Sequence, residues 1–176
     1  IIDDFCSKYH LSFEDLHDMA YLLDSNYKKG DKQAVEQAPY YLIKNPGPYA
    51  ILEHEIWKRN LVELDEEINT ILQEATDKID SIIMKTLHTK SNIISTITRK
   101  IAWNNNQDTV VVNKGYFEDE DQLYVRTIDK DMQPMIMKGK EYGFKCGGKK
   151  EVLGAILPKE KTESFVNEIV TYLSKQ

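Results

Sequence analysis

The sequence has few of the residues that support covalent cross-links or metal chemistry. Its two cysteines, Cys6 and Cys146, lie far apart, and only four histidines are spread over the chain. Two cysteines build neither a disulfide framework nor a metal site, so a reducing, cytoplasmic setting is expected. No Ser, Cys or His stands in a known nucleophile–base motif. The sequence therefore predicts no catalytic centre within this chain.

Long apolar runs are also absent. No segment approaches the roughly 20 apolar residues that cross a bilayer, which argues against a membrane protein. The opening residues 1–4 contain no initiator Met and no basic segment followed by an apolar one, so they do not form a signal peptide. We therefore expect this chain to be part of a longer protein.

The composition is that of an ordinary globular protein. Of the 176 residues, 41% are hydrophobic and 30% are charged, which is enough to bury a core. The formal net charge of -6 argues against indiscriminate coating of nucleic acid, because such binding depends on neutralising phosphates. A local basic site is still compatible with this total.

Residues 1–79 are predicted to form a helical connector region. Ser12 is a helix cap with Asp15 three residues later, and Asn45-Pro46-Gly47-Pro48 interrupts the helical pattern. A long helix is expected from about Tyr49 to about Lys78, because apolar residues recur every three or four positions, at Trp57, Leu61, Leu64, Ile68, Ile71 and Ala75. We favour a connector packed on its own chain over a coiled coil that binds a partner.

Residues 80–176 are predicted to form an α/β domain with a mixed sheet. Strands alternate with helices along this part of the chain. The β-branched run Val110 to Val112 is typical of a buried strand. We expect strands at 81–87, 109–112, 122–127 and 152–157, and helices at 92–103, 132–142 and 159–175.

The most informative segment contains Gly147-Gly148 before the expected strand at 152–157. Glycines let backbone N–H groups approach a ligand closely, and successive amides in a turn form a concavity that binds anions. Lys145, Lys149 and Lys150 surround the pair with positive charge. These residues alone leave two interpretations open. One is a phosphate-binding site, and the other is an ordinary tight turn with solvated lysines, which is the commoner of the two.

The stretch from Gly147 to Ala155, with the Ile-Leu-Pro turn and terminal helix that follow, resembles the closing motif of RecJ-like proteins. These are DHH-family phosphoesterases, and the archaeal, GINS-associated type is most similar. Arg126 stands at the arginine of the family's Ser-x-Arg-Ser or Ser-x-Arg-Ala motif, and the resemblance covers about residues 50–176. Two positions depart from the family: Lys149 replaces the histidine of Gly-Gly-His, and Tyr124 replaces a serine. Lysine keeps the positive charge but loses the imidazole's titration near neutral pH.

The resemblance implies that residues 80–176 are the DHH-associated substrate-binding domain. It implies that phosphates of single-stranded nucleic acid are held by Arg126, Gly147, Gly148, Lys149 and Lys150. The catalytic DHH domain, in which Asp and His residues hold two Mn²⁺ or Mg²⁺ ions, is expected outside this chain, because the chain has no Asp-His-His triplet.

The residues around Arg126 leave alternatives open. The arginine is suited to grip phosphate oxygens, but an ion pair with the acidic run 118–121 is the ordinary alternative. The flanking aromatic residues Tyr116, Phe117 and Tyr124 either stack on unpaired bases or pack within the hairpin. Packing is expected for Phe117, and both roles stay open for Tyr124.

Three functions are compatible with the resemblance. The first is the phosphate-binding, C-terminal part of a metal-dependent single-strand exonuclease that acts in DNA replication and repair. The second is a non-catalytic replication scaffold that binds GINS, which Lys149 and the acidic balance favour somewhat. The third is a phosphodiesterase of short oligonucleotides, because it shares the same two-domain plan.

Overall fold

The computed structural model describes residues 2–45 and 49–175. The chain forms two compact units, residues 1–69 and residues 70–176. The sequence predicts an interruption of the helical pattern around Pro46-Gly47-Pro48, and these three residues lie outside the described ones. No helix in the described ranges combines the length and apolar character needed to cross a membrane.

The first unit is helical. It contains α1 (Ile2–Tyr9), α2 (Phe13–Lys29), α3 (Lys32–Lys44), α4 (Tyr49–Leu52) and most of α5 (Glu55–Gln73). The predicted cap of α2 is confirmed, because Ser12 Oγ accepts from the Asp15 N–H at 3.0 Å and the Asp15 carboxylate accepts from the Ser12 N–H at 2.7 Å. One buried apolar cluster of this unit contains Leu22, Ala34, Ile51 and Trp57.

The prediction of a single helix over residues 49–78 is wrong. The structure has two helices there, and residues 77–79 form strand β1 (Asp77–Ile79). The buried ammonium of Lys85 bonds the carbonyl oxygens of Glu74 and Ala75, at 3.1 and 3.2 Å. A continuing helix would need both oxygens for amides four residues later. The helical stripe is correct up to Ile71, which is buried, but Ala75 is exposed beyond the helix end.

The second unit is built on a six-stranded sheet with the order β1-β2-β3-β4-β6-β5. Strands β2 and β3 are parallel, and the other neighbours are antiparallel. The predicted α/β class with a mixed sheet is therefore confirmed. The further strands are β2 (Ile82–Leu87), β3 (Thr109–Asn113), β4 (Glu120–Arg126), β5 (Lys145–Lys149) and β6 (Val152–Pro158).

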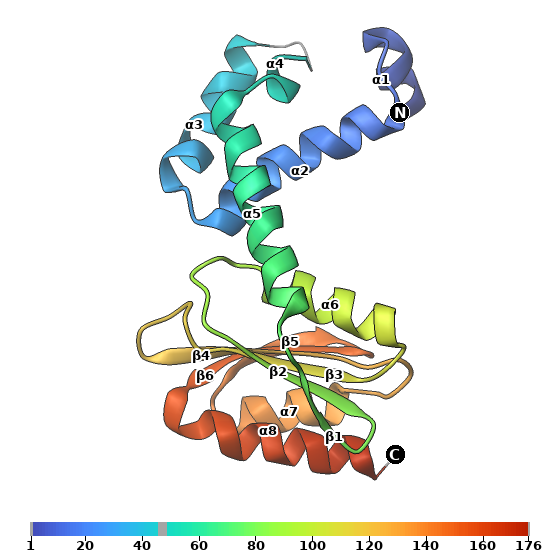
Figure 1. Ribbon diagram of the computed structural model, residues 1–176, viewed down its shortest axis with the longest axis vertical. Helices are drawn as coiled ribbons and strands as arrows, with labels where there is room; N and C mark the ends of the chain where they lie inside the picture. Colours follow the sequence, from blue (N-terminus) through green and yellow to red (C-terminus); the bar gives the residue numbers. More distant parts are fainter. Residues whose placement is uncertain (1, 46–48, 176) are drawn as a thin grey trace. The chain divides into compact units, whose positions relative to one another are not determined.

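Helices cover the two faces of this sheet unequally (Figure 1). On one face α6 (Ile94–Asn105) lies against β3 and β4, and on the other α7 (Gln133–Glu141) and α8 (Lys159–Ser174) cover the sheet. The predicted inward positions Phe165 and Ile169 of α8 are buried in the core. Along β6, buried and half-buried residues alternate, so the face away from α7 and α8 is partly open.

Candidate nucleic-acid interface

The strand register brings three of the predicted site residues to one face of the sheet. Arg126 in β4 lies opposite Lys149 in β5, with one residue of β6 between them, and Tyr124 lies opposite Gly147 in the next row. Directly paired residues share a face, and this is the face that α6 partly covers. Because neighbouring strands are about 4.8 Å apart, the backbones of Arg126 and Lys149 are about 10 Å apart.

The two glycines lie within strand β5, so the predicted glycine turn is wrong. The tight turn is formed by Lys150 and Glu151 instead. Successive residues of a strand point to opposite faces, and the two glycines differ accordingly. A Cβ added at Gly147 would meet no atom within 4 Å, whereas one at Gly148 would lie 1.9 Å from the Val152 carbonyl oxygen. Glycines are depleted in strands, which is why the sequence indicated a turn.

The turn between β5 and β6 is fixed to the segment that follows Arg126. The Thr127 N–H donates to the Glu151 carbonyl at 3.0 Å, and the Met132 N–H donates to the Lys150 carbonyl at 2.6 Å. Thr127 and Met132 are both buried. These hydrogen bonds hold the turn beside the end of β4, while the side chain of Lys150 stays exposed.

The alternative of an ion pair between Arg126 and the acidic run is wrong. The run ends at the start of β4 and Arg126 is at its other end, about 20 Å away at the usual rise per residue. The run has other partners: Lys145 Nζ lies 3.1 Å from a Glu120 carboxylate oxygen, and Lys159 Nζ donates to the Glu118 carbonyl. Lys145 therefore adds little free charge to this face.

Arg126 instead lies beside two residues of α6 that the sequence reasoning missed. Its guanidinium carbon is 5.5 Å from the centre of the Trp103 ring, and that of Arg99 is 5.7 Å from the same centre. Among the described residues, neither arginine nor Lys149 makes an ion pair. The signal was present, since Arg99 and Trp103 are one turn apart and outside the buried stripe of the helix.

A hollow of about 320 Å³ lies on the same face. Its lining comes from the start of α6 and from strands β4, β5 and β6, and includes Tyr124, Lys145 and Gly154. A Cβ added at Gly154 would lie 3.6 Å from a Tyr124 ring carbon, so the ring runs over the bare backbone of β6. Tyr124 is half-buried there, whereas Tyr116 and Phe117 contact each other at 4.7 Å between ring centres, as packing predicts.

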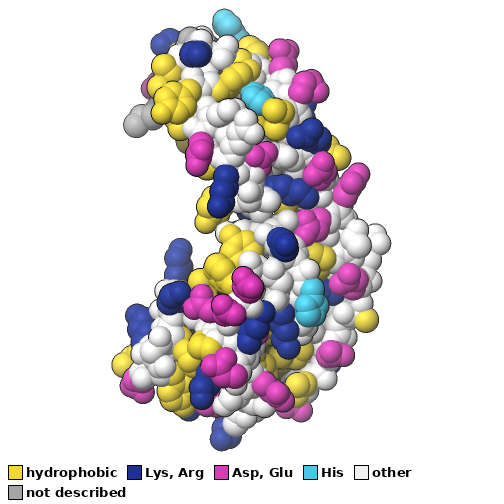
Figure 2. All heavy atoms as spheres, turned by 90° about the vertical axis from the view of Figure 1, so that its left-hand side faces the viewer, with side chains coloured by type: hydrophobic (Ala, Val, Ile, Leu, Met, Phe, Trp, Pro, Cys, Tyr) yellow, Lys and Arg dark blue, Asp and Glu magenta, His cyan; other side chains and the backbone are white. Residues whose placement is uncertain are grey.

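The negative net charge belongs to the first unit. Residues 1–69 contain 7 basic and 14 acidic side chains, and residues 70–176 contain 16 basic and 15 acidic ones. Figure 2 shows basic and acidic side chains interspersed over the visible face of the molecule, without a continuous basic surface. An anion site on the second unit would therefore need local cations whose charge is not balanced by a carboxylate.

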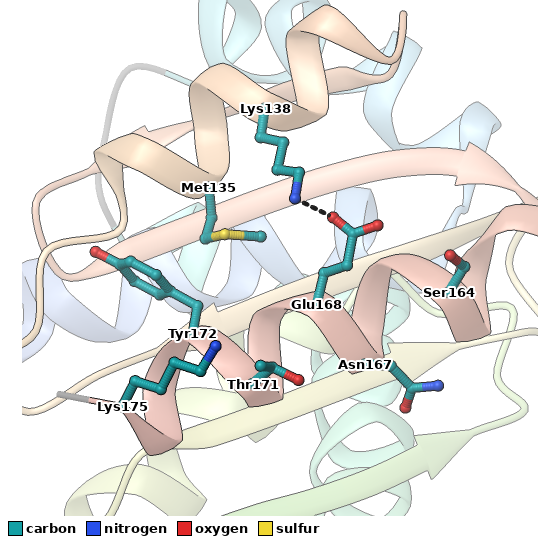
Figure 3. Close-up of a pocket in the computed structure, with 8 residues that line it drawn as sticks. All are labelled: Met135, Lys138, Ser164, Asn167, Glu168, Thr171, Tyr172 and Lys175. Carbon is teal, nitrogen blue, oxygen red and sulfur yellow. Dashed lines mark ion pairs between the residues drawn. The ribbon is translucent and has the colours of Figure 1, made fainter.

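A larger cavity, of about 490 Å³, lies between α7 and α8 on the other side of the sheet (Figure 3). Lys138 Nζ and a Glu168 carboxylate oxygen are 2.7 Å apart across it, as the dashed line in Figure 3 marks. The hydrogen bond to Glu168 raises the pKa of Lys138. The carboxylate of Glu168 therefore balances the charge of this ammonium within the cavity.

The described ranges contain no group of three or more His, Cys, Asp or Glu side chains that could hold a metal ion. The Mn²⁺ or Mg²⁺ ions implied by the resemblance therefore find no ligand set among these residues. The face formed by Arg126, Gly147 and Lys149 has cations and bare backbone, which suit binding of an anion, and we assign no step of hydrolysis to it.

Comparison with known proteins supports a RecJ-like fold. No protein-family model matches the chain, and no curated protein matches it, but solved structures do. RecJ from Thermus thermophilus in complex with Mg²⁺ matches with a TM-score of 0.65 and 15% identity, over 89% of this chain and 25% of RecJ. An exonuclease RecJ bound to manganese matches with a TM-score of 0.52 and 13% identity, over 73% and 32% of the two chains.

The pGpG-specific phosphodiesterase PggH from Vibrio cholerae also matches, with a TM-score of 0.50 and 12% identity, over 76% of this chain and 48% of PggH. At these identities the likeness is one of fold. The chain spans about a quarter of the length of Thermus RecJ. The predicted resemblance to RecJ-like proteins is therefore confirmed as a fold, and the archaeal, GINS-associated type stays a prediction.

Proposed function

We propose that the second unit binds phosphates of single-stranded nucleic acid as the substrate-binding part of a RecJ-like, metal-dependent exonuclease. One observation carries the proposal: Arg126, Gly147 and Lys149 share a partly open face of the sheet, in a chain with a RecJ-like fold. Lys150, exposed at the adjacent turn, is a further cation of the proposed site.

The chemistry of the face fits a sugar-phosphate backbone. The Arg126 guanidinium can hold two phosphate oxygens at once, and Lys149 offers a compact charge about 10 Å away, which is far enough to meet a different phosphate. Gly147 places bare backbone in the next row of the sheet, beside Lys149, so a strand can approach β5 closely there. Neither cation reads base edges, and the binding should therefore tolerate any sequence.

Lysine at position 149 suits binding better than proton transfer. Its ammonium keeps the positive charge that a phosphate needs, but it has no acceptor nitrogen that titrates near neutral pH. We assign the hydrolytic step to a DHH domain outside this chain, where two Mn²⁺ or Mg²⁺ ions would activate water. In this division of roles, the chain positions the substrate and the metal domain cleaves it.

A second candidate is the substrate-binding part of a phosphodiesterase of short oligonucleotides. The similarity to PggH favours it, because pGpG has only two nucleotides. Both candidates use the same cations, but a long strand contacts more of them than a dinucleotide does. The scaffold that binds GINS stays a prediction from the sequence.

The test is fluorescence anisotropy of a labelled oligothymidylate mixed with the 176-residue chain at several salt concentrations. Each phosphate neutralised on a single strand adds about -0.7 to the log–log salt slope. We expect Arg126→Ala and Lys149→Ala each to weaken binding and to reduce the slope by about that amount. Lys161→Ala, which removes an exposed cation from α8, is the matched control and should leave both unchanged.

Competition separates the two candidates. Displacement of the label by unlabelled oligothymidylate at far lower concentration than by pGpG supports a strand-binding surface. Equal displacement by the dinucleotide supports the short-substrate candidate. Binding that Arg126→Ala and Lys149→Ala leave unchanged would contradict both, because the predicted face would then take no part.

A further inference from the structure

Trp103 is exposed where a tryptophan has no packing role. Its side chain is 61% exposed in the last turn of α6, whereas Trp57, in the first unit, is 1% exposed. The buried stripe of α6 is made by Ile94, Ile97 and Ile101, and Trp103 lies outside it. An indole offers a large rigid surface for contacts, and more than half of this residue's surface is accessible to solvent.

Two arginines from different elements flank this ring. The guanidinium carbons of Arg99 in α6 and Arg126 in β4 are 5.7 and 5.5 Å from the ring centre. Both distances are within the range of cation–π attraction, which favours keeping the two guanidinium groups near the ring. No carboxylate in the described ranges pairs with either arginine, so two like charges lie at one indole without an anion to balance them.

This combination matches the needs of an unpaired nucleotide. A base stacks on an aromatic ring through its flat face, and its phosphates need cations nearby. A base inside a duplex has both faces covered by its neighbours, so the exposed indole selects single strands. Arg126 also belongs to the phosphate-binding face described above, which makes Trp103 a neighbour of the path proposed for the strand.

We propose that Trp103 is a base-stacking platform for single-stranded nucleic acid, with Arg99 and Arg126 holding the phosphates on either side of the stacked base. This inference rests on the proposed function, because it adds a base contact to the same strand-binding face. The contact uses the flat face of the base, and it therefore adds affinity for any sequence.

Tryptophan fluorescence tests the contact directly. In a Trp57→Phe chain, Trp103 is the one remaining tryptophan, and titration with oligothymidylate should quench it as the strand binds. The same result is obtained without that variant by comparing the native chain with Trp103→Phe, which should lose the quench. A strand with abasic sites in place of bases should bind weakly and quench little.

Affinity supplies the second readout. Trp103→Ala should weaken binding of oligothymidylate about 5- to 150-fold, the range for losing one stacked base, and Trp103→Phe should retain most of it. The abasic strand should bind Trp103→Ala and the native chain equally. Met137→Ala is the matched control, because Met137 is 62% exposed on α7 at the other face of the sheet, and it should bind like the native chain.

Each outcome distinguishes this inference from the function it rests on. Binding detected by anisotropy, with no quench and with native affinity in Trp103→Ala, overturns the stacking platform and leaves the phosphate-binding face standing. In that case the two arginines only pack against the indole and balance the helix end. No binding of any strand at low salt overturns the proposed function, and the stacking platform falls with it.

Discussion

A carboxylate placed at Gly147 should repel the bound strand while leaving the protein folded. The position is suited to this change because an added Cβ meets no atom within 4 Å, and its backbone is not one of those with positive φ. We compare Gly147→Asp with Gly147→Asn, which has nearly the same shape and no charge. Any difference between the two variants is therefore electrostatic.

The expected size follows from the strand geometry. Lys149 lies two residues further along β5 on the same face, so a phosphate held by it is about 7 Å from the new carboxylate. Two unit charges at that distance repel by about 0.6 kcal/mol in water and by about 2.4 kcal/mol at an effective dielectric constant of 20. Binding of Gly147→Asp should thus be about 3- to 60-fold weaker than that of Gly147→Asn.

The assay is anisotropy of a labelled oligothymidylate, with thermal unfolding as the check on folding. The Debye length is about 8 Å at physiological salt, so the difference between the variants should shrink as salt rises above that level. Equal affinities of Gly147→Asp and Gly147→Asn at low salt would refute the reasoning, because no phosphate then approaches this part of β5.

Three further results are expected. The isolated chain should release no nucleotides from a single strand with Mn²⁺ or Mg²⁺, and activity that co-purifies with the folded protein would contradict this. Asp108→Ala should lower the free energy of unfolding, measured in urea, by about 3–5 kcal/mol, because the buried carboxylate lies 3.0 Å from Lys130 Nζ. Asp108→Asn should destabilise the protein less than Asp108→Ala does. Burial raises the pKa of the Cys146 thiol, so in a Cys6→Ser chain the midpoint pH of its alkylation should be higher in the folded protein than in the chain unfolded in urea. A midpoint at or below that of the unfolded chain would count against this environment.

The sequence was sufficient to predict most of the fold of the second unit. A continuous β-branched run marked the buried strand β3, and regular isoleucines marked the inward face of α6, as the burial of Val111 and Ile97 confirms. The prediction failed where tertiary contacts decide the structure. The apolar stripe of α5 gave no sign of its end at Gln73, because a buried lysine ten or more residues later in the sequence bonds the two carbonyls that follow the helix.

The candidate site was only partly predictable. The charged residues Arg126 and Lys149 could be named from the sequence, but their common face follows from the register of β4, β6 and β5. A shift of one residue in either pairing would have placed them on opposite faces. Trp103 and Arg99 were missed for a related reason, since only the position of α6 over β4 brings them to Arg126.

The Gly147-Gly148 pair shows why a motif and a site are different things. Adjacent strand residues face opposite sides of a sheet, so two neighbouring glycines cannot serve one ligand in the same way. Gly148 has φ 154° and no room for a side chain against the Val152 carbonyl, so the β5–β6 pairing itself requires glycine there. Gly147 has open space and is not required by the backbone, so its lack of a side chain serves the partly open face. Substitution at Gly148 should therefore damage folding, and substitution at Gly147 should damage binding, although the sequence presents them as one signal.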